Sequence, residues 1–161
     1  MKKQRGFTLI EMIITVAILG VLAAIAWPIY ENQSAKARRS DAAVALTNAR
    51  QALVSFRSDN GDFPADAATA TTALRNHLTT APNTPPVDCR DQRGYQIPAG
   101  AGIISCQNLY SITVTAADIN SFTLTATPTS HPDAECATLT LDHLGTRGRT
   151  GSGPVDRCWA Q

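Results

Sequence analysis

The chain has 161 residues, a formal net charge of +1 and 43% hydrophobic residues, a size that suits one domain with an additional anchoring segment. A charge so close to balance excludes the strong overall field that attracts nucleic acid or an acidic surface from a distance. The charges are unevenly placed, because the N-terminal region holds a basic cluster followed by a long stretch without any charge.

The N-terminal region has the composition of a membrane-spanning helix. Lys2, Lys3 and Arg5 come first, and the 19 residues from Met12 to Tyr30 carry no charge. Such a run approaches the roughly 20 residues that an α-helix needs to cross a bilayer. Because basic residues stay on the cytoplasmic side, the N-terminus is predicted to be cytoplasmic and the rest of the chain extracytoplasmic.

Two ordinary explanations fit this segment poorly. A secretory signal peptide has an apolar region of roughly 7–15 residues that ends at a small-residue cleavage site, whereas here the run is longer and Trp27-Pro28-Ile29-Tyr30 follows. A plain membrane anchor explains the length but leaves Glu11 without a purpose. A charged side chain in hydrocarbon costs roughly 2.5–3.5 kcal/mol on insertion scales, so its presence requires a reason.

The segment Gly6-Phe7-Thr8-Leu9-Ile10-Glu11 resembles the processing site of type IV pilins and related pseudopilins. The resemblance implies that prepilin peptidase cuts between Gly6 and Phe7 on the cytoplasmic side and N-methylates Phe7. It also implies that Glu11 pairs with the new Phe7 amine of a neighbouring subunit, where opposite charges in a low dielectric attract strongly. Cleavage there would remove residues 1–6, which hold three of the 14 basic residues. The mature chain would then have 155 residues with 11 basic and 13 acidic groups, a net charge of −2.

The polar continuation of this segment also favours a helix. Residues 31–58 contain no Gly or Pro. Apolar residues recur on one helical face, namely Ala35, Ala42, Leu46, Ala49, Leu53 and Phe56. A helix over 7–58 would be about 78 Å long, with its first half in the membrane or a filament core and its second half against a globular head.

Two residues interrupt the first half of this predicted helix. Pro28 removes a backbone hydrogen bond, and Gly20 lies eight residues before it. A simple kink is one interpretation; the resemblance to pilins offers another, a stretch that unwinds in the filament and lends it extensibility. Asn60-Gly61 predicts the end of the helix, and the segment 59–64, DNGDFP, resembles the Asn-Gly-x-aromatic-Pro signature that ends the stem in many pilins.

Beyond the stem, the pattern predicts a head with a short helix and an antiparallel sheet. Residues 64–86 are rich in Ala and Thr, with a short helix expected at 72–78 and a proline-rich loop after it. Alternation predicts strands around 110–114, 122–126 and 139–141, a fourth near 95–97 and a hairpin link at 116–120. The stem stripe would cover the apolar face of the sheet. The predicted fold class is α+β, a long N-terminal α-helix packed against an antiparallel sheet of about four strands.

The C-terminal order of residues adds to the resemblance. The pattern YSITVTA…FTLTATP…D…C..LTLD..G…CW, from Tyr110 to Trp159, resembles the minor-pilin group often labelled PilE. The resemblance implies the type IV pilin fold and a division into a leader at 1–6, a transmembrane and filament-core helix at 7–30, an amphipathic half of the stem at 31–60 and a head at 61–161.

Four cysteines, at 89, 106, 136 and 158, allow three pairings. No zinc spacing is present, and a head outside the cytoplasm meets an oxidising compartment, so disulfides are expected. Order along the chain favours Cys89–Cys106 and Cys136–Cys158. The second pair also matches the bridge that closes the C-terminal loop of pilins. Each bridge would contribute about 3 kcal/mol by restraining the unfolded chain.

Other candidate sites have simpler interpretations. His131, Asp133 and Glu135 alternate like metal ligands but also fit a solvated turn. Residues 142–148 offer too few oxygen ligands for a calcium site. The glycine-rich segment 145–153 lacks the Lys-Ser/Thr ending of a phosphate loop, and a flexible loop inside the Cys136–Cys158 bridge is favoured. No arrangement of residues suggests catalysis, so neither an enzyme nor a cofactor is expected.

The leading hypothesis is a minor subunit of a type IV pilus, with other pilin subunits, prepilin peptidase and the inner-membrane assembly platform as partners. It would reside in the inner membrane and then in the extracellular pilus. A type II secretion pseudopilin is the first alternative, although those heads usually lack the C-terminal bridge. The second is a module that binds DNA or a surface through Arg147, Arg149 and Arg157. These arginines lack an interleaved aromatic platform, so direct contact with nucleic acid is not expected.

Overall fold

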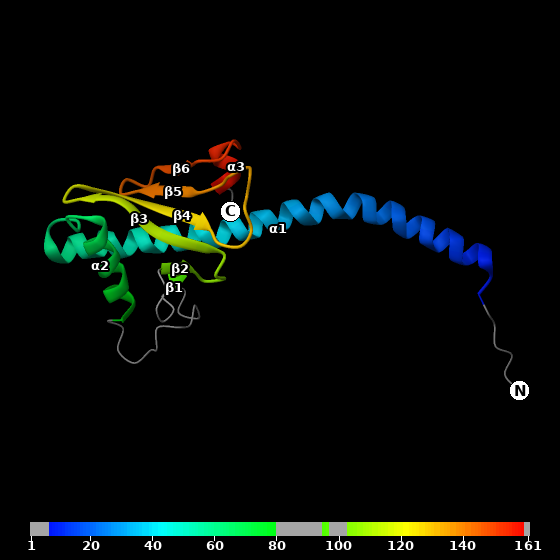
Figure 1. Cartoon of the computed structure of the whole chain (residues 1–161), viewed down its shortest axis with the longest axis horizontal. Helices are drawn as coiled ribbons and strands as arrows, with labels where there is room; N and C mark the ends of the chain where they lie inside the picture. Colours follow the sequence, from blue (N-terminus) through cyan, green and yellow to red (C-terminus); the bar gives the residue numbers. More distant parts are fainter. Residues whose placement is uncertain (1–6, 80–94, 97–102, 160–161) are drawn as a thin grey trace, which may run out of the picture. The chain divides into compact units, whose positions relative to one another are not determined.

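The computed structural model describes residues 7–79, 95–96 and 103–159 (Figure 1). The chain divides into two compact units, one that ends at Ala35 and one that begins at Lys36. A single long helix, α1, Leu9–Asn60, contributes to both units. The helix begins two residues later and ends two residues later than the sequence predicts.

The ends of α1 are closed by local hydrogen bonds. At its start, the backbone carbonyl of Thr8 accepts a hydrogen bond from the amide of Met12 at 3.3 Å. At its end, Gly61 adopts a φ of 90°, and its amide donates to the carbonyl of Arg57 at 2.8 Å. A positive φ is cheap for glycine, so the helix stop predicted at Asn60-Gly61 is confirmed.

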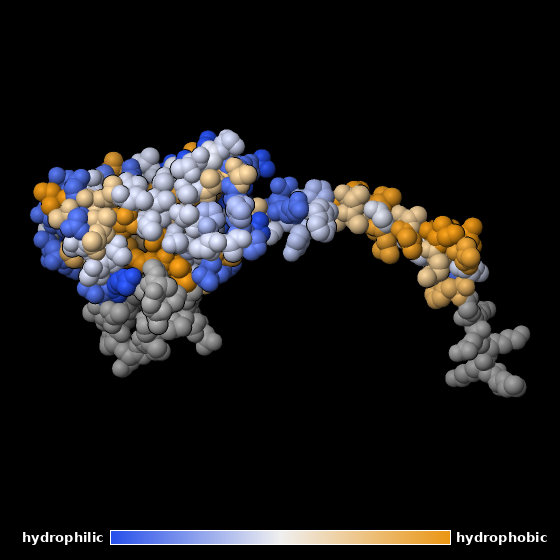
Figure 2. All heavy atoms as spheres, viewed as in Figure 1, coloured by the Kyte–Doolittle hydropathy of each residue, from blue (hydrophilic) through white to orange (hydrophobic). Residues whose placement is uncertain are grey.

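In the first unit, α1 exposes apolar side chains around its circumference, and Figure 2 shows those on one face. The large apolar residues between Phe7 and Tyr30 are 52–79% exposed. By length and composition, this part of the helix is apolar enough to cross a membrane, with a mean hydropathy of 2.6 over an 18-residue window. A helix that is hydrophobic all round is one that lipid or other protein must cover.

In the second unit, one face of α1 is buried against the head. Ala42, Leu46, Ala49 and Leu53 are fully buried, so the predicted stripe is confirmed over its centre. Its ends, Ala35 and Phe56, are only half-buried. Burial of a leucine side chain stabilises a fold by roughly 1.5–3 kcal/mol, and small alanines allow the sheet to approach the helix closely.

The second helix, α2, Ala67–Thr79, is longer than the helix predicted at 72–78. Asp66 provides the reason, because its Oδ1 accepts a hydrogen bond from the amide of Thr69 at 2.7 Å. An aspartate in this position satisfies a free amide of the first turn, so the helix begins directly after it. Hydrogen bonds from the Thr69 amide and hydroxyl lower the pKa of Asp66.

The head contains an antiparallel sheet whose strands follow one another in chain order. The described residues form six strands: β1 Tyr95–Gln96, β2 Ile103–Ser105, β3 Tyr110–Asp118, β4 Ser121–Pro128, β5 Leu139–Asp142 and β6 Arg147–Arg149. A short helix, α3, Val155–Trp159, follows. The α+β class is confirmed, but the sheet exceeds the expected four strands, because the sequences of β2 and β6, IIS and RGR, show no apolar alternation.

The long hairpin of β3 and β4 lies along the second half of α1 (Figure 1). Its register runs from Tyr110 opposite Pro128 to Asp118 opposite Ser121, with a β-bulge between Val114 and Ala116. The predicted link at 116–120 was too wide, since β3 continues to Asp118 and only two residues turn. The carboxylate of Asp118 closes this turn by accepting hydrogen bonds from the amides of Asn120 and Ser121.

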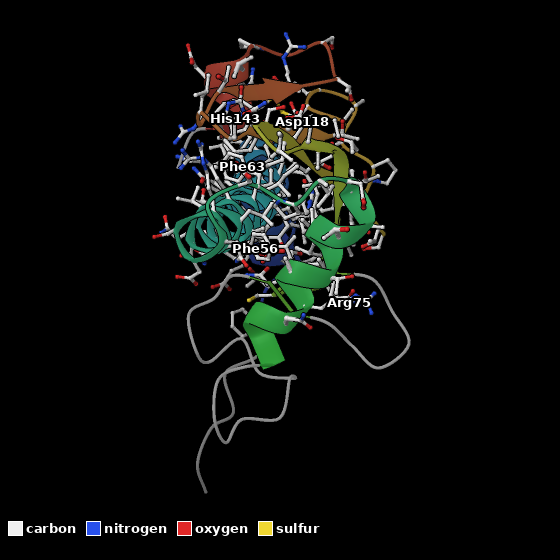
Figure 3. All side chains as sticks on the ribbon, turned by 90° about the vertical axis from the view of Figure 1, so that its left-hand side faces the viewer. Phe56, Phe63, Arg75, Asp118 and His143 are labelled. Carbon is white, nitrogen blue, oxygen red and sulfur yellow. A yellow bond between two sulfur atoms is a disulfide. The ribbon has the colours of Figure 1, made fainter. Side chains whose placement is uncertain are left out.

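The aromatic residue of the DNGDFP segment is a core residue. Phe63 is 5% exposed, and its ring meets that of Phe122 edge-on, with centroids 5.0 Å apart. It also lies beside His143 (Figure 3), and the guanidinium of Arg57 sits 4.7 Å from its centroid. The signature therefore fastens the end of α1 to the sheet.

Candidate functional site

The first candidate site is the N-terminal part of α1. Within its exposed apolar surface, Glu11 is the only charged residue between Leu9 and Tyr30. The backbone amide of Glu11 donates a hydrogen bond to the hydroxyl of Thr8 at 3.3 Å. The carboxylate of Glu11 has no hydrogen bond or ion pair within the described chain. Phe7 is 79% exposed, and Gly6 lies outside the described residues. The geometry leaves both Phe7 and Glu11 open to a group from another molecule.

Gly20 and Pro28 both lie inside α1, which continues through them. A Cβ atom added at Gly20 would have no neighbouring atom within 4 Å, so packing in this chain does not require a glycine there. Pro28 has no amide to donate, and its carbonyl accepts a hydrogen bond from the Asn32 side chain at 3.0 Å. The predicted flexibility of this stretch stays a prediction.

The second candidate site is the C-terminal loop, closed by a disulfide. Cys136 and Cys158 are bonded, with their Cα atoms 5.5 Å apart, and both are buried. The predicted Cys136–Cys158 pair is therefore confirmed. Beside it, the indole of Trp159 donates a hydrogen bond to the carbonyl of Gly148 at 2.9 Å, which joins α3 to β6.

Two glycines of this loop, Gly151 and Gly153, pack tightly against Glu135, while the flexibility favoured for the loop stays a prediction. The amides of Gly151 and Gly153 donate to the carbonyls of Cys136 and Glu135, at 3.1 and 2.7 Å. A Cβ atom at Gly151 would lie 2.3 Å from the carbonyl oxygen of Glu135. Glycine is required here because the two backbones approach too closely for any side chain.

A buried arginine ties α1 to the segment before the disulfide. The Nε atom of Arg39 lies 2.6 Å from Asp133, and its Nη2 atom lies 2.8 Å from Glu135. The other oxygen of Glu135 lies 3.1 Å from Arg157. The Arg39 side chain is only 8% exposed. The expectation of a solvated turn at Asp133 and Glu135 was therefore wrong, since both carboxylates neutralise a buried cation.

Asp133 also organises its own turn. Its Oδ1 accepts hydrogen bonds from the amides of Glu135 and Cys136, each at 3.1 Å. Burial alone would raise the pKa of Asp133, but the hydrogen bond from Arg39 and those from the backbone outweigh it and lower the pKa. The same contact with Asp133 raises the pKa of Arg39 despite its burial, so both partners are charged at neutral pH.

The three C-terminal arginines each have a contact within the chain. The guanidinium of Arg147 lies 5.3 Å from the ring centroid of Trp159, that of Arg149 donates to the carbonyl of Gly151, and that of Arg157 pairs with Glu135. Trp159 is 3% exposed, so it gives no stacking platform. Arg147 and Arg157 remain largely exposed and can still meet an anion.

The other predicted bridge lies partly outside the described residues. Cys106 is disulfide-bonded, but Cys89 lies outside the described residues, so the Cys89–Cys106 pair stays a prediction. Ser105 next to it is buried, and its hydroxyl accepts hydrogen bonds from the amides of Leu109 and Tyr110. His131 contacts only its neighbour Ser130 among the described contacts.

Comparison with known families gives two matches. A family described as "Type IV minor pilin ComP, DNA uptake sequence receptor" matches residues 28–140. The "Prokaryotic N-terminal methylation motif" matches residues 1–27. Together these matches cover the apolar helix, the stem and most of the sheet, and they confirm the resemblance to type IV pilins. The C-terminal arginines lie beyond the first match.

Individual relatives agree with these families. Fimbrial protein EcpC of Eikenella corrodens is 45% identical over 67 residues, which are 42% of this chain and 44% of EcpC. Type IV major pilin protein PilE1 of Neisseria gonorrhoeae is 30% identical over 108 residues, 67% of this chain and 59% of PilE1. The chain thus spans about half the length of these relatives. A solved type IV pilin from Shewanella oneidensis is 28% identical, over 79% of this chain and 99% of that chain, with a TM-score of 0.42.

Proposed function

The chain belongs to the type IV pilins, in the minor-pilin family of ComP, and from this premise we propose that it is a minor subunit of a type IV pilus. Prepilin peptidase removes residues 1–6 and methylates the amine of Phe7. The mature subunit then waits in the inner membrane, with its head extracytoplasmic, until the assembly platform adds it to the filament. The observation that carries this proposal is the exposed apolar helix with one carboxylate, that of Glu11, that has no partner among the described residues.

The physical chemistry of this surface supports assembly. Exposure of an apolar helix to water is unfavourable, whereas its transfer into lipid or into the core of a filament is favourable. The Glu11 carboxylate is costly alone in hydrocarbon and becomes favourable once a positive amine comes within contact distance. The tightly packed Cys136–Cys158 loop favours a pilus subunit over the alternative of a secretion pseudopilin.

Mass spectrometry of the native protein tests the processing step. The mature chain is expected to begin at Phe7 and to carry one methyl group, and the Gly6→Val variant is expected to accumulate as a full-length precursor in the membrane. Gly20→Val serves as a matched control, because it lies outside the junction and should be cleaved normally. A native chain that begins at Met1, or that is cut after Ala24 or Ala26, would contradict the proposal.

Direct DNA binding by the head is our second proposed function, because the matching family carries the description of a DNA uptake sequence receptor. The near-neutral charge of the chain gives no long-range field, so binding would depend on local cations. Arg147 and Arg157 are the exposed candidates, held on β6 and α3 by the packing described above. Their guanidinium groups suit phosphate oxygens, which accept charge-assisted hydrogen bonds.

Electrophoretic mobility shift of duplex DNA by the full chain in detergent tests this second function. The Arg147→Ala/Arg157→Ala variant is expected to bind more weakly and to lower the slope of log affinity against log salt by about two, since each phosphate contact contributes about 0.9. Lys36→Ala, an exposed cation of α1 outside the C-terminal loop, is the control and should keep the slope. Absence of binding by the unmodified chain at low salt would exclude DNA binding and leave the pilus assignment intact.

A further inference from the structure

Two aromatic side chains mark the end of the apolar part of α1. Trp27 and Tyr30 are 68% and 72% exposed and, three residues apart, lie on one face of the helix. The indole Nε1 of Trp27 donates a hydrogen bond to Glu31 at 3.0 Å, so its polar edge is directed toward the first charged residue after the apolar run. Rings with an apolar body and one polar handle prefer the boundary between hydrocarbon and headgroups.

The length of α1 before Trp27 is close to the thickness of a bilayer core. Leu9, the first residue of α1, lies 18 residues before Trp27, which is about 27 Å along a helix, and Phe7 precedes Leu9 by two residues. The hydrocarbon core of a membrane is about 30 Å thick. With Trp27 at one boundary, a helix along the bilayer normal therefore places Phe7 close to the other.

We propose that Trp27 and Tyr30 form an interfacial anchor that binds the extracytoplasmic headgroup layer and fixes the register of α1 in the bilayer before assembly. This inference rests on the proposed function, because it concerns the membrane-resident state of the subunit. The partner is the lipid interface itself. Ester and phosphate groups there accept a hydrogen bond from the phenol of Tyr30, while the indole of Trp27 keeps its hydrogen bond to Glu31 and both rings stay among the first carbons of the acyl chains.

The anchor also determines the depth of Glu11 in the bilayer before assembly. Glu11 is 16 residues before Trp27, or about 24 Å along the helix, and so lies only about 6 Å inside the cytoplasmic boundary. A glutamate side chain at this depth reaches the headgroups and their water. Both groups of the proposed intersubunit pair, the Glu11 carboxylate and the Phe7 amine, are then hydrated until the subunit leaves the membrane.

Depth-dependent fluorescence quenching tests the anchor. The full chain has two tryptophans, and Trp159→Phe leaves Trp27 as the single reporter. The variant is inserted into phosphatidylcholine vesicles that carry bromine either close to the headgroups or near the ends of the acyl chains. Bromine near the headgroups is expected to quench Trp27 at least twofold more strongly than bromine near the chain ends.

Two controls calibrate the measurement. Trp27→Phe keeps only the head reporter, Trp159, which is expected to be unaffected by either lipid. If Trp159→Phe fails to fold, subtraction of the Trp27→Phe signal from that of the unmodified chain gives the same information. Ile18→Trp, in a chain that also carries Trp27→Phe and Trp159→Phe, places an indole about 13 Å deeper and should show the opposite order of quenching.

The outcomes separate this inference from the proposed function. Stronger quenching of Trp27 by bromine near the chain ends, in vesicles that carry the protein on flotation, would overturn the anchor while membrane residence stands. Failure of the chain to float with vesicles would overturn both. Replacement of Trp27 and Tyr30 by leucine should abolish the fixed depth, so that a tryptophan at position 18 is quenched almost equally by both lipids.

Discussion

Glu11 is the residue at which subunit pairing can be tested directly. Glu11→Gln keeps the shape of the side chain but removes the charge that would meet a neighbouring amine, and Glu11→Ala removes both. Loss of one partner of a desolvated ion pair costs about 2–5 kcal/mol, and every 1.4 kcal/mol is a factor of ten. We expect both variants to be cleaved normally but to enter filaments at least tenfold less than the unmodified chain, measured by immunoblot of sheared pili.

Thr15→Val is the matched control for this prediction. Thr15 is also an exposed polar residue of the apolar segment, but its hydroxyl already donates to the carbonyl of Met12 at 2.9 Å. It therefore has no need of a partner on another subunit, and the variant should assemble like the unmodified chain. Equal incorporation of Glu11→Gln and Thr15→Val would show that the carboxylate has no role in pairing.

Side-chain pairs distant in sequence were the least predictable features. Arg39 meets Asp133 across 94 residues, and no local pattern connects them. The available signal was the position of Arg39 on the alanine-rich side of α1, since a buried arginine requires a carboxylate partner. The alternation of Asp133 and Glu135 was visible but suggested metal ligands or a solvated turn.

Elements with strong local signals were predicted well. The apolar stripe and Asn60-Gly61 placed α1 within two residues at each end, and alternation over five residues placed β3 and β4. The two missed strands, β2 and β6, show no alternation, because the sequence IIS has two apolar residues in a row and RGR has none. They form because neighbouring strands already present a ladder of backbone groups, which is a tertiary effect.

The glycine-rich segment around β6 gives a prediction at the scale of the element. Gly151→Ala places a methyl group against the backbone of Glu135 and Cys136, and overpacking of this kind costs about 1–3 kcal/mol. The melting temperature of the head is expected to fall by several degrees in near-UV circular dichroism. Gly20→Ala, where no atom lies within 4 Å, should leave that transition unchanged. An unaltered melting temperature for Gly151→Ala would favour the interpretation of a flexible loop.

At the scale of the whole molecule, the ion pairs of Arg39 join the long helix to the segment just before the disulfide. The disulfide closes the C-terminal loop on itself, whereas Arg39 of α1 binds Asp133 and Glu135, which precede Cys136. Arg50 of α1 contacts the loop itself by donating to the carbonyl of His143. Because the folded chain lowers the pKa of Asp133 below its ordinary value of 3.8, its contribution to stability is complete above pH 3.8. That contribution is lost as the pH falls from there through the lowered pKa.

A double-mutant cycle at two pH values measures this connection. Arg39→Met alone leaves the carboxylates of Asp133 and Glu135 without their buried cation and is expected to lower the free energy of unfolding by about 3–5 kcal/mol at pH 7. Asp133→Asn should also destabilise the head. At pH 7 the double variant should lose less than the sum of the two single losses, with a coupling of about 1–3 kcal/mol in denaturant unfolding. At a pH well below 3.8, Asp133 is increasingly protonated in both states, so the coupling should shrink toward zero while Arg39 keeps its charge. Additive losses at pH 7, or a coupling that persists undiminished in acid, would mean that the pair does not hold α1 and the segment before the disulfide together.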